Sequence, residues 1–279
     1  MLFDRNIQLD SRWPDCYLEP YVSNPIYTNK RKALLIIPGG GYHCVCADRE
    51  GEPIALEFLS YGYQCFVLHY STSATSNAAY PAQLIQAALA MQHIKNYADE
   101  YRIDAEQVFV VGFSAGGHLA GCLATMWHRP EIYAQTSMPV GYPRPAGAML
   151  IYPVVTGKEA FSHKESFQNL LASEHPSPED CLACSLECAV DERSSPVFLV
   201  HTANDQVVGV ENSLLLAAAY AKAKISFELH IFPDAPHGVA LANEITRSGE
   251  PKWENPSIAL WVRHGVAWMN YICGGNQYE

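Results

Sequence analysis

Five short apolar segments, separated by longer stretches, constrain the fold more than any other feature of this sequence. Each has four or five residues and contains no polar residue at alternate positions. Strands with this pattern are buried on both faces, as they are in parallel sheets that helices cover on each side. The segments are residues 33–37, 65–68, 108–111, 148–151 and 197–200.

A sixth apolar segment, residues 225–231, has a different pattern. Its apolar residues alternate with Ser226, Glu228 and His230, which is typical of a strand near the edge of a sheet with one face partly wet. The stretches between strands have helical spacing, and Pro81 stands where a proline at the first helical position is expected. Helices are predicted at about 50–61, 82–102, 115–127, 211–223 and 256–272.

The alternation of strands and helices predicts an α/β fold with a doubly wound, mostly parallel sheet and helices on both faces. The chain has 279 residues, of which 49% are hydrophobic, so one domain over residues 1–279 is expected. Residues 156–194 lack a strand signal and separate two strands. We expect this segment to form a small cap or lid.

The strongest functional motif is the sequence GFSAG at residues 112–116. It follows a predicted strand directly and opens a predicted helix, which is the context of a nucleophile elbow. In such an elbow, Ser114 is presented at the N-terminus of a helix, where developing negative charge is favoured. Taken alone, the motif also fits a glycine-rich turn that packs a helix on a sheet.

A glycine-rich segment, PGGGY at residues 38–42, follows the first predicted buried strand. This is the place of an oxyanion loop, whose backbone N–H groups stabilise the oxygen that becomes negative during acyl transfer. We expect the N–H of Gly40 or Gly41 to act together with that of Ala115. Phosphate binding is the alternative, but no GxGxxG or GK[ST] pattern is present.

Asp205 and His237 each follow a predicted strand, and the chain order Ser114, Asp205, His237 is that of α/β-hydrolases. A serine hydroxyl is a poor nucleophile unless a neutral imidazole accepts its proton, and a carboxylate fixes the tautomer of that imidazole. His43, His118 and His230 are weaker candidates for the base, because none lies in the loop after the last strand. Asp234 is the rival acid, but it is too close in sequence to His237.

With these motifs, the chain resembles the bacterial α/β-hydrolase esterases related to acetyl xylan esterases and other carbohydrate acetylesterases, within the broader esterase/lipase group. The resemblance implies that Ser114, Asp205 and His237 form a triad, with Gly40, Gly41 and Ala115 as the oxyanion hole. Where that family often has an arginine and an aspartate, this chain has Ser71 and Gln86. The resemblance covers about residues 33–272 and rests on PGGGY (38–42), EGEP (50–53), GFSAGGHLA (112–120), YPV (152–154), NSL (212–214), ELHIF (228–232) and PHG (236–238).

Charge and cysteine content bear on partners and location. The net charge of −11 argues against nucleic acid as a partner. The charged N-terminus and the absence of a long apolar run predict neither a signal peptide nor membrane association, and nine scattered cysteines fit a reducing compartment, so a cytoplasmic location is expected. The sequence is compatible with a homo-oligomer and does not decide the oligomeric state.

Two further residue groups could suggest other chemistry. Cys181, Cys184 and Cys188 could hold zinc with His175, but their spacing is also that of one helix face, which favours packing. Glu50 and Glu52 could form a glycosidase-type acid/base pair, but a role at the N-terminus of the following helix is favoured. We expect no metal and no cofactor.

The predicted function is that of a serine carboxylesterase acting on short-chain esters, acetyl esters first, of carbohydrates or other small alcohols. A formamidase or amidase using the same triad is the first alternative. The second is a binding protein with a hydrolase fold that has lost its triad, although all three triad positions are filled here.

Overall fold

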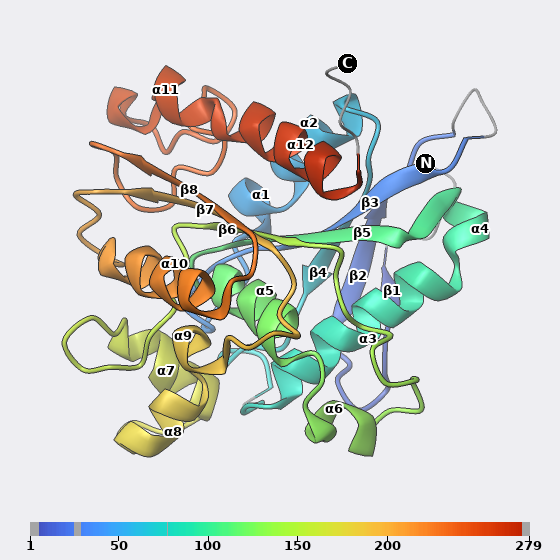
Figure 1. Ribbon diagram of the computed structural model, residues 1–279, viewed down its shortest axis with the longest axis horizontal. Coiled ribbons are helices and arrows are strands. Elements are labelled where there is room, and N and C mark those ends of the chain that lie inside the picture. Colours follow the sequence, from blue (N-terminus) through green and yellow to red (C-terminus); the bar gives the residue numbers. More distant parts are fainter. Residues whose placement is uncertain (1–5, 25–28, 77, 275–279) are drawn as a thin grey trace.

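The computed structural model describes residues 6–24, 29–76 and 78–274, and over these residues eight strands form one sheet (Figure 1). The strand order is β1-β2-β4-β3-β5-β6-β7-β8. All neighbours from β4 to β8 are parallel, whereas β1 pairs with β2, and β2 with β4, in the antiparallel sense. The strands are β1 (Ile7–Gln8), β2 (Tyr17–Tyr21), β3 (Arg31–Ile37), β4 (Gln64–His69), β5 (Ile103–Phe113), β6 (Ala148–Ile151), β7 (Val197–Thr202) and β8 (Phe227–Phe232).

Helices cover both faces of the sheet, as the sequence predicts (Figure 1). One face carries α3 (Ala82–Asn96), α5 (Ser114–Met126) and α10 (Glu211–Ala223), and the other carries α2 (Glu52–Ser60) and α12 (Trp261–Ile272). The shorter helices are α1 (Ala47–Glu50), α4 (Ala98–Tyr101), α6 (Pro130–Ala134), α7 (Lys164–Leu171), α8 (Pro178–Ala183), α9 (Leu186–Ala189), the 3-10 helix η1 (Pro251–Trp253) and α11 (Pro256–Ala259).

Strand β3 shows why the buried segments are apolar throughout. Leu35 and Ile37 belong to the core on the α3 and α5 side, whereas Leu34 and Ile36 belong to the core on the α2 and α12 side. Successive side chains of a strand point to opposite faces, and here both faces are covered. Each of these residues is therefore buried.

The structure adds two strands that the apolar pattern did not predict. β2 has the sequence YLEPY, in which Pro20 and Glu19 interrupt any apolar run. A proline is tolerated at that position because β2 lies near the antiparallel end of the sheet and not among its central parallel strands. Three predicted helices are also each divided in two, at Gly51, Tyr97 and Leu260.

The last strand, β8, forms the outer edge of the sheet, as its alternating pattern predicts. Leu229 packs on the core, whereas Phe227 and Ile231 keep 37% and 39% of their surface exposed. Within the described part of the chain, no helix combines the length and the apolar composition that a membrane span requires.

Candidate active site

Ser114 lies at the junction of the central strand β5 and helix α5, at the carboxyl end of the strand. Its φ of +52° is in the left-handed region, which a serine occupies only under strain. A Cβ on Gly116 would lie 2.2 Å from the carbonyl oxygen of Ile37 and 2.3 Å from that of Pro38. The glycine therefore allows α5 to start directly against the end of β3, which is the local geometry of a nucleophile elbow.

The structure brings Ser114, His237 and Asp205 into one chain of hydrogen bonds. His237 Nε2 lies 2.8 Å from Ser114 Oγ, and His237 Nδ1 lies 2.7 Å from Asp205 Oδ2. The three residues follow β5, β8 and β7, so they meet beyond the carboxyl ends of the strands. An imidazole held in this way can accept the hydroxyl proton of a serine.

The carboxylate of Asp205 is buried, yet its surroundings favour the ionised form. Burial alone would raise its pKa, but the neighbouring His201, the hydrogen bond and charge of His237 and the N–H of Val208 lower that pKa well below its usual range. Val207 N and Val208 N lie 2.9 and 3.0 Å from Oδ1. Asp205 is therefore a fixed acceptor beside the imidazole at neutral pH.

His201 supports this carboxylate, and the sequence did not single it out. It is buried at the end of β7, with Nε2 at 3.6 Å from Asp205 Oδ2 and 2.8 Å from the carbonyl oxygen of Val208. Its Nδ1 lies 2.7 Å from Ser213 Oγ on α10. The only sequence signal for this role is its position four residues before Asp205.

The rival candidates are not part of this chain of hydrogen bonds. Asp234 is exposed and accepts a hydrogen bond from Asn204 Nδ2. His118 is buried between the hydroxyl of Tyr42 and the carbonyl oxygen of Cys184, and burial lowers its pKa to about 4. His43 and His230 contact other groups: His43 Nδ1 lies 3.1 Å from Ser73 Oγ, and the His230 ring stacks on that of His264.

The loop after β3 has the shape expected of an oxyanion loop. Gly40 and Gly41 have φ values of +124° and +63°, and a Cβ on Gly40 would lie 2.2 Å from the carbonyl oxygen of Cys44. Within the described part of the chain, the N–H groups of Gly40 and Gly41 donate to no protein acceptor. Ala115, at the second position of α5, also has no intrahelical acceptor. These three N–H groups are available to a ligand oxygen.

Glu50 neither forms an acid/base pair with Glu52 nor stands at the N-terminus of the following helix, the two roles that the sequence suggested. It is the last residue of α1 and is 1% exposed. Its carboxylate accepts hydrogen bonds from the Gly39 N–H at 2.8 Å and from the Tyr152 hydroxyl at 2.9 Å. Glu52, in contrast, is exposed at the start of α2. The two side chains therefore form no acid/base pair, and only Glu52 stands at a helix N-terminus.

Residues 156–194 contain α7, α8 and α9, and part of this segment lies against the oxyanion loop. Asn169 Nδ2 on α7 donates to the carbonyl oxygen of Gly41 at 2.9 Å, and Ser73 Oγ donates to Asn169 Oδ1 at 3.0 Å. A Cβ on Gly41 would contact Ser166 Oγ at 3.9 Å. Helix α7 is thus the part of the predicted lid that reaches the site.

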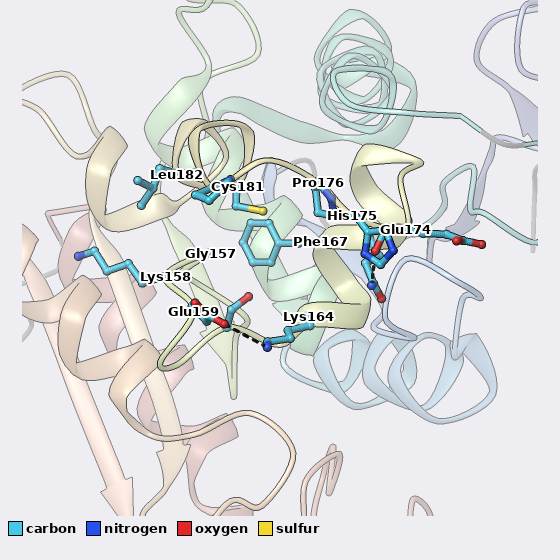
Figure 2. Close-up of a pocket in the computed structure, with 13 residues that line it drawn as sticks. Gly157, Lys158, Glu159, Lys164, Phe167, Glu174, His175, Pro176, Cys181 and Leu182 are labelled. Carbon is cyan, nitrogen blue, oxygen red and sulfur yellow. Dashed lines mark hydrogen bonds and ion pairs between the residues drawn. The ribbon is translucent and has the colours of Figure 1, made fainter.

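Two cavities of similar size differ in what lines them. One of about 530 Å³ lies among α7, α8 and their loops, and Figure 2 shows Phe167, Lys158 and Lys164 among its lining residues. None of the three triad residues lines it. The other, of about 520 Å³, is lined by His237, with Val207 among its other residues. Of these two cavities, only the second is lined by a residue of the candidate triad, His237.

The prediction that the three clustered cysteines share one helix face is wrong. Cys181 lies on α8, Cys184 follows its end, and Cys188 lies on α9. Cys181 and Cys184 are buried in the core, whereas Cys188 is exposed. Among the residues that the structure describes, no group of three potential ligands is arranged to hold a metal.

Ser71 and Gln86, the two departures from the family pattern, contact each other. Gln86 Oε1 accepts from Ser71 N at 2.9 Å, and Gln86 Nε2 donates to Ser71 Oγ at 2.8 Å. Both are buried. A neutral, hydrogen-bonded pair therefore occupies these two positions.

Comparison with known proteins gives the family. The model of the BD-FAE family matches residues 21–220. The chain is 38% identical over 226 residues to endo-1,4-beta-xylanase B of Butyrivibrio fibrisolvens, covering 79% of this chain and 34% of that protein. It is 28% identical over 210 residues to the acetylxylan esterase of Xylanibacter ruminicola, covering 74% of this chain and 41% of that protein. The chain thus spans about a third and about two fifths of the length of these curated relatives.

Solved structures match over nearly the whole length. The acetyl ester-xyloside bifunctional hydrolase of Caldicellulosiruptor lactoaceticus has a TM-score of 0.81 and 30% identity, covering 97% of this chain and 96% of the other. A carboxylesterase of Lactobacillus plantarum, with a TM-score of 0.77, 23% identity and 92% coverage of each chain, supports the fold alone. By its family match and its structure, the chain belongs to the BD-FAE family and has the fold of the α/β-hydrolase esterases.

Proposed function

We propose that this protein is a serine carboxylesterase in which Ser114 is the nucleophile, His237 the general base and Asp205 the residue that orients the base. The hydrogen-bonded chain from Ser114 Oγ through His237 to Asp205 carries the proposal. The free N–H groups of Gly40, Gly41 and Ala115 beside it support the same reaction.

In the first half of the reaction, Ser114 Oγ attacks the ester carbonyl carbon while its proton passes to His237 Nε2. The carbonyl oxygen becomes negative, and the oxyanion-loop N–H groups stabilise it. His237 then gives the proton to the leaving alcohol, and the acyl group stays on Ser114. In the second half, water attacks the acyl-enzyme with His237 as base, and a carboxylic acid and free Ser114 are formed.

The proposed substrates are short-chain esters, acetyl esters first, of carbohydrates or other small alcohols. One relative is named an acetylxylan esterase and one solved structure an acetyl ester-xyloside hydrolase, which supports this choice. Helix α7 is our candidate for the element that blocks longer acyl chains, because it lies against Gly41. A cytoplasmic location is also proposed, supported by nine free cysteines.

The nucleophile is tested with Ser114→Ala and a fluorophosphonate probe, which reacts with activated serines. We expect wild-type protein to be labelled and to hydrolyse aryl esters, and the variant to lose labelling and to lose kcat on the order of 10⁶-fold with the fold intact. Labelling of the variant, or turnover near that of the wild type, would show that Ser114 is not the nucleophile.

The acyl preference is tested with aryl esters of rising chain length, run beside acetylated xylo-oligosaccharides, with acid release measured. A hydrophobic slot discriminates by only about 1–3 kcal/mol per methylene, so preference for acetyl over butyryl requires a blocked acyl pocket. We expect acetyl to give the highest kcat/KM. A maximum at octanoyl or longer would remove the acetylesterase assignment and leave the serine mechanism in place.

A further inference from the structure

A single buried carboxylate joins two parts of the site that are far apart in the sequence. Glu50 Oε2 accepts the N–H of Gly39, the first residue of the glycine-rich run, and Glu50 Oε1 accepts the hydroxyl of Tyr152, which is 102 residues away and follows β6. Both oxygens are thus occupied by site residues. No substrate atom is needed to satisfy them.

Tyr152 extends this connection to the histidine. Its hydroxyl accepts the N–H of Ala240 at 3.0 Å, in the loop that carries His237. Its ring lies edge to face against the His237 imidazole, with the ring centroids 4.9 Å apart. Tyr152 is therefore anchored to the histidine loop and contacts the imidazole itself.

The space beside Gly39 shows how closely the carboxylate and the elbow are coupled. A Cβ on Gly39 would lie 2.8 Å from Glu50 Oε2, 2.8 Å from the carbonyl oxygen of Phe113 and 3.0 Å from Ser114 Cβ. A small displacement of Gly39 would consequently change the position of the oxyanion loop relative to Ser114 Oγ. Rate is sensitive to such displacements, because an error of about 1 Å can cost roughly 100-fold.

The charge of Glu50 is costly to bury, so its presence needs a reason. Burial raises its pKa, and Arg49, the Gly39 N–H, the Tyr152 hydroxyl and His237 oppose that rise. Cys46 and Tyr70 are the other titratable groups whose pKa it affects. A carboxylate offers acceptors to both donors at once, whereas a glutamine of the same shape offers one acceptor oxygen and a competing N–H₂.

We propose that Glu50 is a positioning residue of this site: its carboxylate holds the Gly39–Gly41 loop against the elbow and, through Tyr152, holds the His237 imidazole. This proposal rests on the proposed function. Glu50 touches no reacting atom in it, and its effect reaches the substrate through the oxyanion loop and the base.

The test is Glu50→Gln, with kcat, KM and the affinity for a boronic acid measured on the same preparation. A boronic acid forms a tetrahedral adduct with an active serine and so reports the oxyanion geometry. We expect kcat to fall roughly 10- to 100-fold with KM nearly unchanged. Affinity for the boronic acid should fall by about the same factor as kcat/KM.

Two further variants separate positioning from stability. Glu187→Gln is the matched control: the Glu187 side chain is 6% exposed, and its Oε1 accepts from Thr156 Oγ1 and pairs with Lys158 Nζ, neither of which belongs to the triad. It should leave kcat and boronic acid affinity unchanged. Tyr152→Phe keeps the ring against His237 and removes the hydroxyl, so it should reduce both quantities even if Glu50→Gln does not fold.

The outcomes are distinguishable. A Glu50→Gln protein that folds and keeps wild-type kcat and boronic acid affinity, while Ser114→Ala is inactive, overturns the positioning role and leaves the esterase proposal standing. The same holds if only Tyr152→Phe folds and it behaves as wild type. A wild-type protein that neither hydrolyses esters nor reacts with fluorophosphonate overturns the proposed function, and the positioning role with it.

Discussion

Two buried carboxylates of the site experience opposite surroundings. Burial on its own raises the pKa of Asp205, but the neighbouring His201 and His237 lower it overall, whereas burial raises the pKa of Glu50 overall. The carboxylate of Asp205 accepts three hydrogen bonds, from Val207 N, Val208 N and His237 Nδ1, with His201 Nε2 at 3.6 Å, whereas the carboxylate of Glu50 accepts two. The contributions of these two carboxyl groups to stability therefore change with pH in opposite directions.

This contrast predicts two opposite dependences of stability on pH. Because the folded-state pKa of Asp205 is depressed, its contribution is present above about pH 4 and is lost as pH falls. The advantage of wild type over Asp205→Asn should therefore shrink in acid. Because the pKa of Glu50 is raised, its contribution to stability is full below about pH 4 and is lost as pH rises. The free energy of unfolding of Glu50→Gln should therefore increase relative to that of wild type as pH rises towards neutrality. Urea unfolding across pH measures both, and gaps that do not vary with pH would contradict them.

Asp205→Asn should also decrease activity far more than Asp234→Asn. An amide cannot stabilise the imidazolium and favours the wrong tautomer of His237, which costs about 10⁴-fold in kcat in a triad of this kind. Asp234 bonds Asn204 and not the imidazole, so its variant should keep wild-type kcat. Steady-state kinetics on an aryl acetate compare the two. Equal losses in both variants would remove Asp205 from the proposed triad.

The sequence located Ser114, Asp205 and His237 because each has a local signal, a motif or a position after a strand. His201 has only its position four residues before Asp205, and Glu50 and Tyr152 belong to the EGEP and YPV segments, which do not indicate a contact between them. Glu50 and Tyr152 are 102 residues apart, and nothing near either residue indicates the other. Contacts of this kind depend on strand order, which the local pattern does not specify.

At the level of elements, the five buried strands were predictable because helices cover both faces of them, and β6 matches its predicted bounds. Strand β2 was not predictable. It contains Pro20 and pairs with β4 in the antiparallel sense, so it does not have the apolar pattern of a buried parallel strand. The predicted segment 156–194 does reach the site. Its internal helices α7, α8 and α9 were too short to produce a periodic signal.

Helix α7 provides the prediction at this scale. Asn169→Ala removes the hydrogen bond to the Gly41 carbonyl, worth about 1 kcal/mol, and loosens α7 from the oxyanion loop. We expect the ratio of butyryl to acetyl kcat/KM to rise about 3- to 10-fold. Gln168→Ala is the control on the same helix, because Gln168 bonds the Glu174 carbonyl and lines the other cavity. An unchanged ratio in Asn169→Ala, or an equal change in both, would argue against α7 as the acyl block.

At the scale of the whole molecule, the candidate site collects residues from position 39 to position 240. Its parts come from the ends of five parallel strands, β3, β5, β6, β7 and β8. The geometry of the site therefore depends on the register of the entire parallel part of the sheet. The family match over residues 21–220 includes Ser114 and Asp205, whereas His237, which completes the hydrogen-bonded chain, lies beyond it.

The left-handed backbone conformation of Ser114 sets a trade-off between thermal stability and catalysis. A non-glycine residue at such a φ costs about 1–3 kcal/mol, whereas glycine costs only about 0.5–1 kcal/mol through the unfolded chain. Ser114→Gly should therefore melt roughly 2–4 °C above Ser114→Ala, since both lose the hydroxyl and only alanine keeps the strain. Calorimetry decides this, and equal melting temperatures would show that the elbow stores no strain. If the glycine variant does melt higher, selection of this chain for heat resistance alone would favour glycine at position 114. The resulting proteins would be more thermostable but would have no nucleophile.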